Sequence, residues 1–459
     1  MLQRVLRFVV FRLVRLFYSH IEVRGSEHLQ PDHPVVFVLN HPNGVLDPIL
    51  LMMALDRPVT FLSKSTLFAH PVPRWAAQTF GALPVYRSRD IGRRGGARDS
   101  EDMAAQNGKT FARCRSLLLE GKAIALFPEG TTHSGPRLLR LQTGAARIAL
   151  SAAAESDWST DLAVIPIGLW YASKTRFRTP VLLVVGEPLP LRAYAEQYTA
   201  DAWTTTREFT DQLEERLAAV VLQAENRMLL RSMPAIAAWT APEGQDAGLG
   251  DRHAWAATLL AAYEQLQRSD PERLGRIEQE VRRYASLLRS LGIADPWQLE
   301  RMSTPSWRAL KLAPVLLLLG PPALLGVLVS YVPHRLSGRL SRAIGRGDRT
   351  QSSLLKLLGG TVLEIGAWLV EAALIGMWFG AKWGVLLFLV APFCAYSAVR
   401  WRELWKTFRD VVSVLRVRGR TGGLAANLAV RRQALARQVM EAVASVQGGA
   451  PGYAEDRTL

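Results

Sequence analysis

The sequence is poor in cysteine, with only Cys114 and Cys394 among its 459 residues. Two cysteines so far apart in sequence support no disulfide framework, which is consistent with a reducing compartment. Cysteine and histidine do not occur at metal-ligand spacings, so no metal is expected. The Gly-x-Ser-x-Gly elbow, the P-loop and the dinucleotide glycine fingerprint are also missing. No motif therefore points to a serine hydrolase, a nucleotide hydrolase or a dinucleotide-dependent enzyme.

Acidic residues are scarce relative to basic ones. The chain has 40 Asp and Glu against 56 Lys and Arg, which gives a formal net charge of +16. Such a balance implies an anionic partner, either nucleic acid or an acidic membrane surface. The sequence has no nucleic-acid motif, and 49% of its residues are hydrophobic. A membrane lipid is therefore the expected partner, and nucleic acid is not, because a nucleic-acid binder leaves the apolar C-terminal part unexplained.

Residues 1–20 lack the cleavage site of a signal peptide. Arginines at positions 4, 7, 12 and 15 fall close to one helical face, and large apolar residues populate the rest. This pattern predicts an amphipathic anchor helix in the membrane interface. An ordinary packed helix is the alternative.

Residues 21–200 alternate between short apolar runs and helical patterns. Strands are predicted near 34–39, 59–62, 82–86, 123–127, 162–168 and 181–185, and the clearest helices at 102–120 and 143–155. This alternation predicts an α/β domain, a mixed sheet flanked by helices. Ligands in such domains gather outside the carboxyl ends of the strands.

The run Asn40-His-Pro-Asn-Gly-Val-Leu-Asp-Pro48 follows the first of these strands. His41 is expected at the strand end, and Asp47-Pro48 as the N-cap and first residue of a helix through Leu55. The tight loop between them is expected to bring His41 and Asp47 together. Taken alone, an Asp before Pro is usually a cap, and a His at a strand end is usually structural. Two further runs favour a functional role for His41 and Asp47. Arg87 ends the run 81–87 after another strand, and Phe127-Pro-Glu-Gly-Thr131 follows a further strand.

With Val164-Ile-Pro-Ile167, these runs resemble, in order, the four motif blocks of the phospholipid/glycerol acyltransferase superfamily. The resemblance covers about residues 20–200. Five residues separate His41 from Asp47 where the common pattern has four, and Thr132 stands where an Arg is common. Both departures are similar to the fungal-type glycerol-3-phosphate and dihydroxyacetone-phosphate acyltransferases.

The resemblance implies acyl transfer without a cofactor, from acyl-CoA or acyl carrier protein to a small phosphorylated acceptor. Neutral imidazole can take a hydroxyl proton near neutral pH, and a carboxylate on its other nitrogen fixes the tautomer. His41 and Asp47 take these roles by resemblance. The residues implied in holding the substrates are Arg87, Phe127, Glu129, Gly130 and Thr131, with Arg137 and Lys64 as further candidates. His133 is expected to be a loop residue without a carboxylate partner.

The C-terminal part changes character. Residues 201–300 are expected to form a cytoplasmic helical region with a linker at 240–250, and residues 421–459 a C-terminal helix and tail. Between them, residues 301–420 hold three apolar segments at 310–332, 359–379 and 383–399, the last two as a hairpin. Basic flanks place their ends in the cytoplasm. Gly320-Pro321-Pro322 is therefore expected to break the first segment into a re-entrant hairpin.

Taken together, these features predict an acyltransferase of phospholipid biosynthesis in the cytoplasmic (inner) membrane, with its catalytic domain facing the cytoplasm. The predicted acceptor is glycerol-3-phosphate or dihydroxyacetone phosphate. A lysophospholipid acceptor, 1-acylglycerol-3-phosphate, is the alternative within the class. A catalytically inactive lipid-binding membrane scaffold is the alternative from another class.

Overall fold

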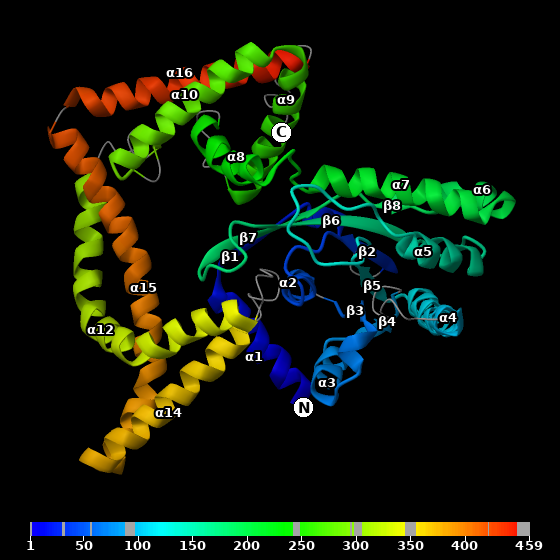
Figure 1. The fold of residues 1–459 in the computed structure, drawn as a ribbon, viewed down its shortest axis with the longest axis horizontal. Helices are drawn as coiled ribbons and strands as arrows, with labels where there is room; N and C mark the ends of the chain where they lie inside the picture. Colours follow the sequence, from blue (N-terminus) through cyan, green and yellow to red (C-terminus); the bar gives the residue numbers. More distant parts are fainter. Residues whose placement is uncertain are drawn as a thin grey trace. The chain divides into compact units, whose positions relative to one another are not determined.

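The computed structural model describes residues 2–29, 33–55, 57–87, 97–241, 248–293, 296–297, 305–344, 355–420 and 422–447. The chain divides into two compact units. Unit 1 comprises residues 1–225 and 345–357, and unit 2 comprises residues 226–344 and 358–459. Figure 1 shows an α/β sheet in unit 1 and helices alone in unit 2.

The central strand of unit 1 is β2 (Val35–Leu39), and all five of its residues are buried. Its sequence, Val-Val-Phe-Val-Leu, consists of branched and aromatic residues that favour a strand covered on both faces. It pairs in parallel with β5 (Ala123–Leu126) on one side and with β6 (Ala163–Tyr171) on the other. The carboxyl ends of these three strands therefore meet at one edge of the sheet.

The eight-stranded sheet has the order β1-β7-β6-β2-β5-β3-β4, with β8 paired to β6. The other strands are β1 (Tyr18–Arg24), β3 (Val59–Lys64), β4 (Ala82–Val85), β7 (Thr179–Val185) and β8 (Leu189–Pro190). Only β6–β7 and β6–β8 pair antiparallel, so the sheet is mixed, as predicted. β2 lies between β5 and β6, which both come later in the sequence. The strand order therefore changes direction at β2, and α/β sheets bind their ligands at such a switch point.

Helices cover both faces of the sheet (Figure 1). Val35, Phe37 and Leu39 point to a core shared with α1 and α2, whereas Val36 and Val38 point to a core shared with α4, α5 and α7. This alternation follows from the two-residue period of a strand. The helices and short 3-10 turns of unit 1 are α1 (Leu2–Phe17), η1 (Ser26–His28), α2 (Leu46–Ala54), η2 (Ser65–Phe68), α3 (Pro71–Thr79), α4 (Ala97–Leu119), α5 (Gly144–Glu155), η4 (Arg192–Tyr194), α6 (Ala195–Ala200) and α7 (Ala202–Val220).

Two predicted boundaries of the catalytic domain differ from the structure. α1 packs on the sheet, with Val10, Val14 and Phe17 buried in the core, and β1 begins at Tyr18, before the predicted boundary at residue 21. Its outer face keeps an amphipathic character, with Phe8 59% exposed beside exposed arginines. At the other boundary, α7 belongs to unit 1 rather than to the predicted region 201–300, because its buried face packs against the sheet.

Gly168 in β6 occupies a position where only a hydrogen fits. A Cβ there would lie 1.9 Å from the backbone oxygen of Val220, which cannot move aside as a side chain can. We expect Gly168→Ala to destabilise the protein by more than about 3 kcal/mol, beyond ordinary overpacking. Gly108→Ala is the matched control, because nothing lies within 4 Å of its Cβ position in α4, and helix propensity favours alanine there. Thermal denaturation measures both; equal melting temperatures would contradict the close approach.

Unit 2 is helical throughout its described residues. Its elements are α8 (Arg227–Thr240), α9 (Leu249–Ser269), α10 (Pro271–Ser290), α12 (Pro305–Ile344), α14 (Gly360–Phe379), α15 (Ala381–Arg420) and α16 (Gly422–Gln447), with the π-helical turn η5 (Leu355–Gly359) at the unit boundary. α16 packs against α8, α9 and α10, while α12, α14 and α15 pack against one another. Asp270 caps α10 by accepting from the backbone N–H of Arg273.

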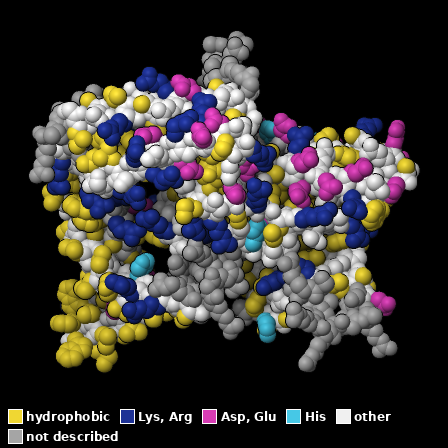
Figure 2. All heavy atoms as spheres, turned by 45° about the horizontal axis from the view of Figure 1, so that its top comes forward, with side chains coloured by type: hydrophobic (Ala, Val, Ile, Leu, Met, Phe, Trp, Pro, Cys, Tyr) yellow, Lys and Arg dark blue, Asp and Glu magenta, His cyan; other side chains and the backbone are white. Residues whose placement is uncertain are grey.

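Three helices of unit 2 are long and apolar enough to cross a membrane, over Lys311–Leu340, Leu357–Phe379 and Ala381–Ser413. α14 and α15 form the predicted hairpin, with Gly380 at a φ of 98° between them. In Figure 2 the end of this hairpin, at the lower left, is covered mostly by apolar side chains. Met377 and Trp378 are 80% and 82% exposed there, as expected of side chains that face lipid.

The predicted break at Gly320-Pro321-Pro322 is wrong. The helix α12 continues through all three residues and holds four prolines in its interior, besides Pro305 at its start. A proline inside a helix removes one hydrogen bond and bends the axis. Such a bend is smaller than the chain reversal that a re-entrant hairpin needs. Figure 1 accordingly shows α12 as one bent helix rather than as two antiparallel segments. The predicted linker and the predicted C-terminal tail fall largely on residues 242–247 and 448–459, outside the described residues.

Candidate active site

The side chain of Asn40 extends the sheet by one residue beyond β2. Its Nδ2 donates to the carbonyl oxygen of Leu169 at 3.1 Å, and its Oδ1 accepts from the N–H of Leu169 at 2.7 Å. The amide side chain thus imitates a backbone pair with β6, in a buried place where unpaired groups are costly. The clamp holds the backbone that carries His41 against the middle of the sheet.

His41 and Asp47 meet at the edge of the sheet. His41 Nδ1 lies 2.8 Å from Asp47 Oδ2, with the carboxylate fully buried and the imidazole 18% exposed. Asp47 lies in the first turn of α2 and is not the predicted N-cap, since Val45 occupies that position. Its Oδ2 accepts instead from the N–H of Asn43 at 2.8 Å. A carboxylate on Nδ1 leaves Nε2 unprotonated and able to accept a proton.

Two tyrosine hydroxyls belong to the hydrogen-bond network around Asp47. The Tyr171 hydroxyl, on the last residue of β6, donates to Asp47 Oδ1. Asn43 Nδ2 donates to the Tyr18 hydroxyl at 2.9 Å. Burial, and then the charge of Asp47, raise the pKa of both phenols well above the usual value. Both therefore stay protonated at physiological pH, which keeps Tyr171 a donor to the carboxylate.

The run Phe127–Thr131 forms a turn beside His41. Gly130 N–H donates to the carbonyl oxygen of Phe127 at 2.9 Å, and Gly130 has a φ of +63°, a conformation that glycine adopts without strain. The Phe127 ring stacks on the imidazole of His41 with a 4.1 Å centroid distance. This contact shields one face of the imidazole from water and fixes its plane.

Glu129 joins three segments around His41. Its Oε1 accepts from the His41 N–H at 3.1 Å, and its Oε2 accepts from the Leu139 N–H at 2.9 Å and from His133 Nε2. Gly135 N–H donates to His133 Nδ1 at 3.0 Å, which assigns the proton of a neutral His133 to Nε2. The prediction that His133 lacks a carboxylate partner is therefore wrong. Sequence proximity gave the signal, because Glu129 and His133 are four residues apart.

The other predicted site residues lie at different depths. Arg87, two residues beyond β4, is half-buried and donates to the Gly130 carbonyl oxygen at 2.7 Å, and Thr131 is half-buried next to that glycine. Lys64, at the end of β3, and Arg137, on the loop after His133, are both exposed. The geometry thus links His41, Asp47, Phe127, Glu129, Gly130 and Arg87 through direct contacts.

Sequence reasoning missed four residues of this cluster. Asn40 and Asn43 lie inside the His41 run itself, where their amides were a visible signal. Tyr18 and Tyr171 carried no signal, because only the pairing of distant strands brings them to Asp47. Within the described ranges, no group of three or more His, Cys, Asp or Glu side chains could hold a metal ion.

A buried Asp thus lies behind a partly exposed His at the switch point of the α/β sheet, an arrangement in which an imidazole is able to accept a proton. Residues 20–170 match the model of the Acyltransferase family. This match agrees with the resemblance of this part of the chain to the phospholipid/glycerol acyltransferase superfamily.

Several known proteins are similar to parts of this chain. The chain is 24% identical over 360 residues to the uncharacterized acyltransferase C1718.04 of Schizosaccharomyces pombe, covering 62% of this chain and 53% of that protein. It is 31% identical over 159 residues to the chloroplastic 1-acyl-sn-glycerol-3-phosphate acyltransferase LPAT1 of Arabidopsis thaliana, covering 34% and 38%. It is 32% identical over 119 residues to glycerol-3-phosphate O-acyltransferase 2 of Saccharomyces cerevisiae, covering 26% and 16%.

The chain thus spans about half, or less, of the length of these relatives. A crystal structure of the 1-acyl-sn-glycerophosphate (LPA) acyltransferase PlsC from Thermotoga maritima aligns at 16% identity with a TM-score of 0.31, covering 47% of this chain and 80% of that one. The α/β fold of unit 1 follows from its own strand order rather than from that superposition.

Proposed function

We propose that this protein is a membrane-bound O-acyltransferase that moves a fatty acyl group from a thioester to glycerol-3-phosphate or dihydroxyacetone phosphate. The observation that carries the proposal is the 2.8 Å contact between His41 Nδ1 and the fully buried Asp47 carboxylate. The pair provides a base of suitable strength and fixed orientation next to a partly open surface. A catalytically inactive scaffold has no need of a buried, triply hydrogen-bonded carboxylate behind an imidazole.

The reaction balances with these groups alone. His41 Nε2 takes the proton of the acceptor hydroxyl while the hydroxyl oxygen forms a bond to the thioester carbonyl carbon. The tetrahedral intermediate collapses, the carbon–sulfur bond breaks, and the leaving thiolate takes the proton from the imidazolium. Asp47 stabilises that imidazolium through Nδ1–H without itself being protonated. The substrate hydroxyl is the nucleophile, so the thioester carrier, coenzyme A or acyl carrier protein, is a co-substrate and no cofactor takes part.

Arg87 and the 127–131 turn form the proposed acceptor site. Guanidinium groups bind two phosphate oxygens at once, and Arg87 is already positioned by the Gly130 carbonyl oxygen. The yeast relative named a glycerol-3-phosphate O-acyltransferase supports this acceptor. Lysophosphatidate, 1-acylglycerol-3-phosphate, is the second candidate, because the plant relatives are named for it. Both acceptors present a hydroxyl near a phosphate.

An acceptor panel tests the proposed function directly. The purified full chain is given palmitoyl-CoA or palmitoyl-acyl carrier protein, with glycerol-3-phosphate, dihydroxyacetone phosphate, lysophosphatidate or free glycerol as acceptor. Mass spectrometry identifies the products. We expect 1-palmitoyl-glycerol-3-phosphate or its dihydroxyacetone counterpart as the main product. Acylation of lysophosphatidate alone would favour the second candidate, and acylation of glycerol at the same rate would refute the phosphate site.

Replacing Arg87 tests the acceptor site itself. We expect Arg87→Ala to raise the KM for the phosphorylated acceptor about tenfold or more, because a charged hydrogen bond contributes about 1.5–3 kcal/mol. The KM for palmitoyl-CoA should stay within about twofold of the wild-type value, because Arg87 is assigned to the phosphate of the acceptor and not to the acyl donor. Arg87→Lys should rescue binding only partly, because the planar fork is lost. Equal rises for both substrates would instead assign Arg87 to holding the Gly130 turn.

We infer that the protein resides in the cytoplasmic membrane with unit 1 on the cytoplasmic side. The three apolar helices support membrane insertion, and the exposed Phe8 face of α1 supports contact of unit 1 with the interface. Arginines and lysines flank the apolar segments after Arg400 and before Lys311. The positive-inside rule favours the cytoplasm for each of these basic flanks. Three full spans would place the two flanks on opposite sides of the membrane, so the proposed orientation of unit 1 uses only the flank before Lys311.

A further inference from the structure

One face of α14 changes from polar to apolar along its length. Glu364, Trp368 and Glu371 recur at spacings of four and three residues, and Ile375 and Phe379 continue the same row. Such spacings place side chains on one helical face. Glu371, Ile375 and Phe379 line a cavity between α12, α14 and α15. Glu364 lies seven residues before Glu371 in the same row and faces Ser330 of α12.

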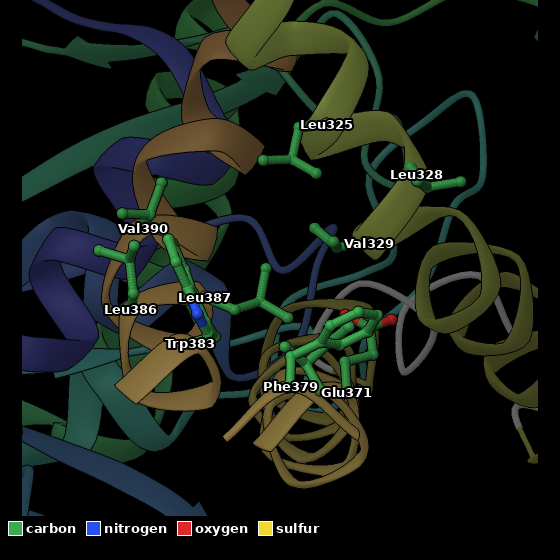
Figure 3. Close-up of a pocket in the computed structure, with 10 residues that line it drawn as sticks. Leu325, Leu328, Val329, Glu371, Phe379, Trp383, Leu386, Leu387 and Val390 are labelled. Carbon is green, nitrogen blue, oxygen red and sulfur yellow. The ribbon is translucent and has the colours of Figure 1, made fainter. Parts of the chain in front are cut away.

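The cavity has a volume of about 740 Å³, inside the range of about 300–1,000 Å³ that is typical of ligand pockets. Its walls are apolar side chains, which include Val329 of α12 and Trp383 and Leu386 of α15. Figure 3 shows these side chains converging from three helices, with Glu371 as the single acidic group labelled among them. The cavity therefore offers an apolar chamber with one polar edge.

One polar atom at that edge lacks a partner within the described part of the chain. Glu371 lines the cavity, and its Oε2 is buried and accepts no hydrogen bond. A carboxylate oxygen accepts hydrogen bonds. Inside a bilayer no water is at hand to satisfy this atom. A lipid hydroxyl would donate to it, as the free hydroxyl of a glyceride can.

We propose that this cavity binds one molecule of an uncharged acyl lipid with a free hydroxyl, of the monoacylglycerol or diacylglycerol class. The acyl chain fills the apolar chamber toward Phe379, and the hydroxyl donates to Glu371. A phosphate head group is disfavoured, because the lining of the cavity includes the acidic Glu371 and no Lys or Arg. The site is built from unit 2 alone and is independent of the His41 chemistry.

Photo-crosslinking in nanodiscs of the full chain tests the proposal. The probe is a monoacylglycerol with a diazirine in its acyl chain, and the comparison probe is the lysophosphatidate with the same chain. Mass spectrometry locates the labelled peptides. We expect saturable labelling of α12 and α15 by the first probe, competed by unlabelled monoolein, and at least about tenfold weaker labelling by the second. Labelling spread evenly over the outer faces of the helices would overturn the proposal, and equal labelling by both probes would overturn the uncharged class.

Variants separate the cavity from ordinary lipid contact. Val329→Trp fills the chamber and should abolish saturable labelling, whereas Leu317→Trp alters a side chain of α12 that is 77% exposed and should leave it within about twofold of wild type. Glu371→Leu should weaken probe binding about tenfold by removing one hydrogen bond, and Glu371→Gln should retain it and admit the phosphate probe. Melting temperatures confirm that each variant is folded. Equal labelling of the two tryptophan variants, or no effect of Glu371→Leu, would refute the site.

Discussion

Replacing His41 by alanine is expected to lower the turnover number by about two to four orders of magnitude, the range typical of a lost general base. The imidazole is the partly exposed member of the pair, and Asp47, fully buried, cannot reach a substrate in its place. Palmitoyl-CoA and the best acceptor of the panel are used at saturation, and product is quantified by mass spectrometry. Binding to the membrane and the KM of the acyl donor should not change.

His20→Ala is the matched control, because His20 lies on β1 of the same sheet with its side chain 63% exposed. Its turnover and melting temperature should equal those of the wild type. If His41→Ala kept more than about a third of wild-type turnover, His41 would be excluded as the base. A His41→Ala protein that had lost its cooperative melting transition would show a structural role through the Phe127 stack instead.

Local patterns predicted much of unit 1. Each of the six predicted strands is present, because buried parallel strands require continuous apolar runs such as 35–39 and 123–126. β1 was missed and its first residues were taken for the anchor, since Tyr-Ser-His-Ile-Glu carries little apolar signal. Its place is decided by pairing with β7, which is more than a hundred residues away. Long-range pairing of this kind leaves no local pattern.

The contacts of the candidate site also divide into local ones, which the sequence predicted, and long-range ones, which it did not. Only five residues separate His41 from Asp47, so the strand end and the helix start must approach and their contact was predictable. The partners that hold the pair come from elsewhere: Tyr171 from the end of β6 and Glu129 from the turn after β5. Only the strand order, with β2 between β5 and β6, brings these side chains together.

The membrane helices show where residue preference yields to context. Gly320-Pro321-Pro322 is a strong breaker in water, yet α12 remains helical through it. A lipid-exposed turn would leave several backbone groups unsatisfied, whereas a proline bend leaves few. Close packing against α15 adds to this, because a Cβ at Gly326 would lie 2.0 Å from the backbone oxygen of Cys394. The helix is therefore held by its neighbour as well as by its own bonds.

Asp47→Asn is expected to lower turnover by about two to four orders of magnitude while the fold survives. The amide has the shape of the carboxylate, and its oxygen can still accept from His41 Nδ1 and from the Asn43 N–H while its NH₂ group donates to the Tyr171 oxygen. The negative charge that stabilises the imidazolium is lost. If the amide turns the other way, it donates to Nδ1 and places the proton on Nε2, which then cannot act as a base.

Tyr171→Phe is the control that separates charge from position for Asp47. It removes the hydroxyl bond to Oδ1 but leaves the carboxylate charged and bound to His41 and Asn43. We expect a loss of turnover of less than about tenfold, with a lower melting temperature because one buried acceptor position is left unpaired. Steady-state kinetics at saturating substrates and thermal denaturation are measured on both variants. Turnover of Asp47→Asn equal to that of Tyr171→Phe would mean that the Asp47 charge is not used, and that the carboxylate serves only to position the imidazole.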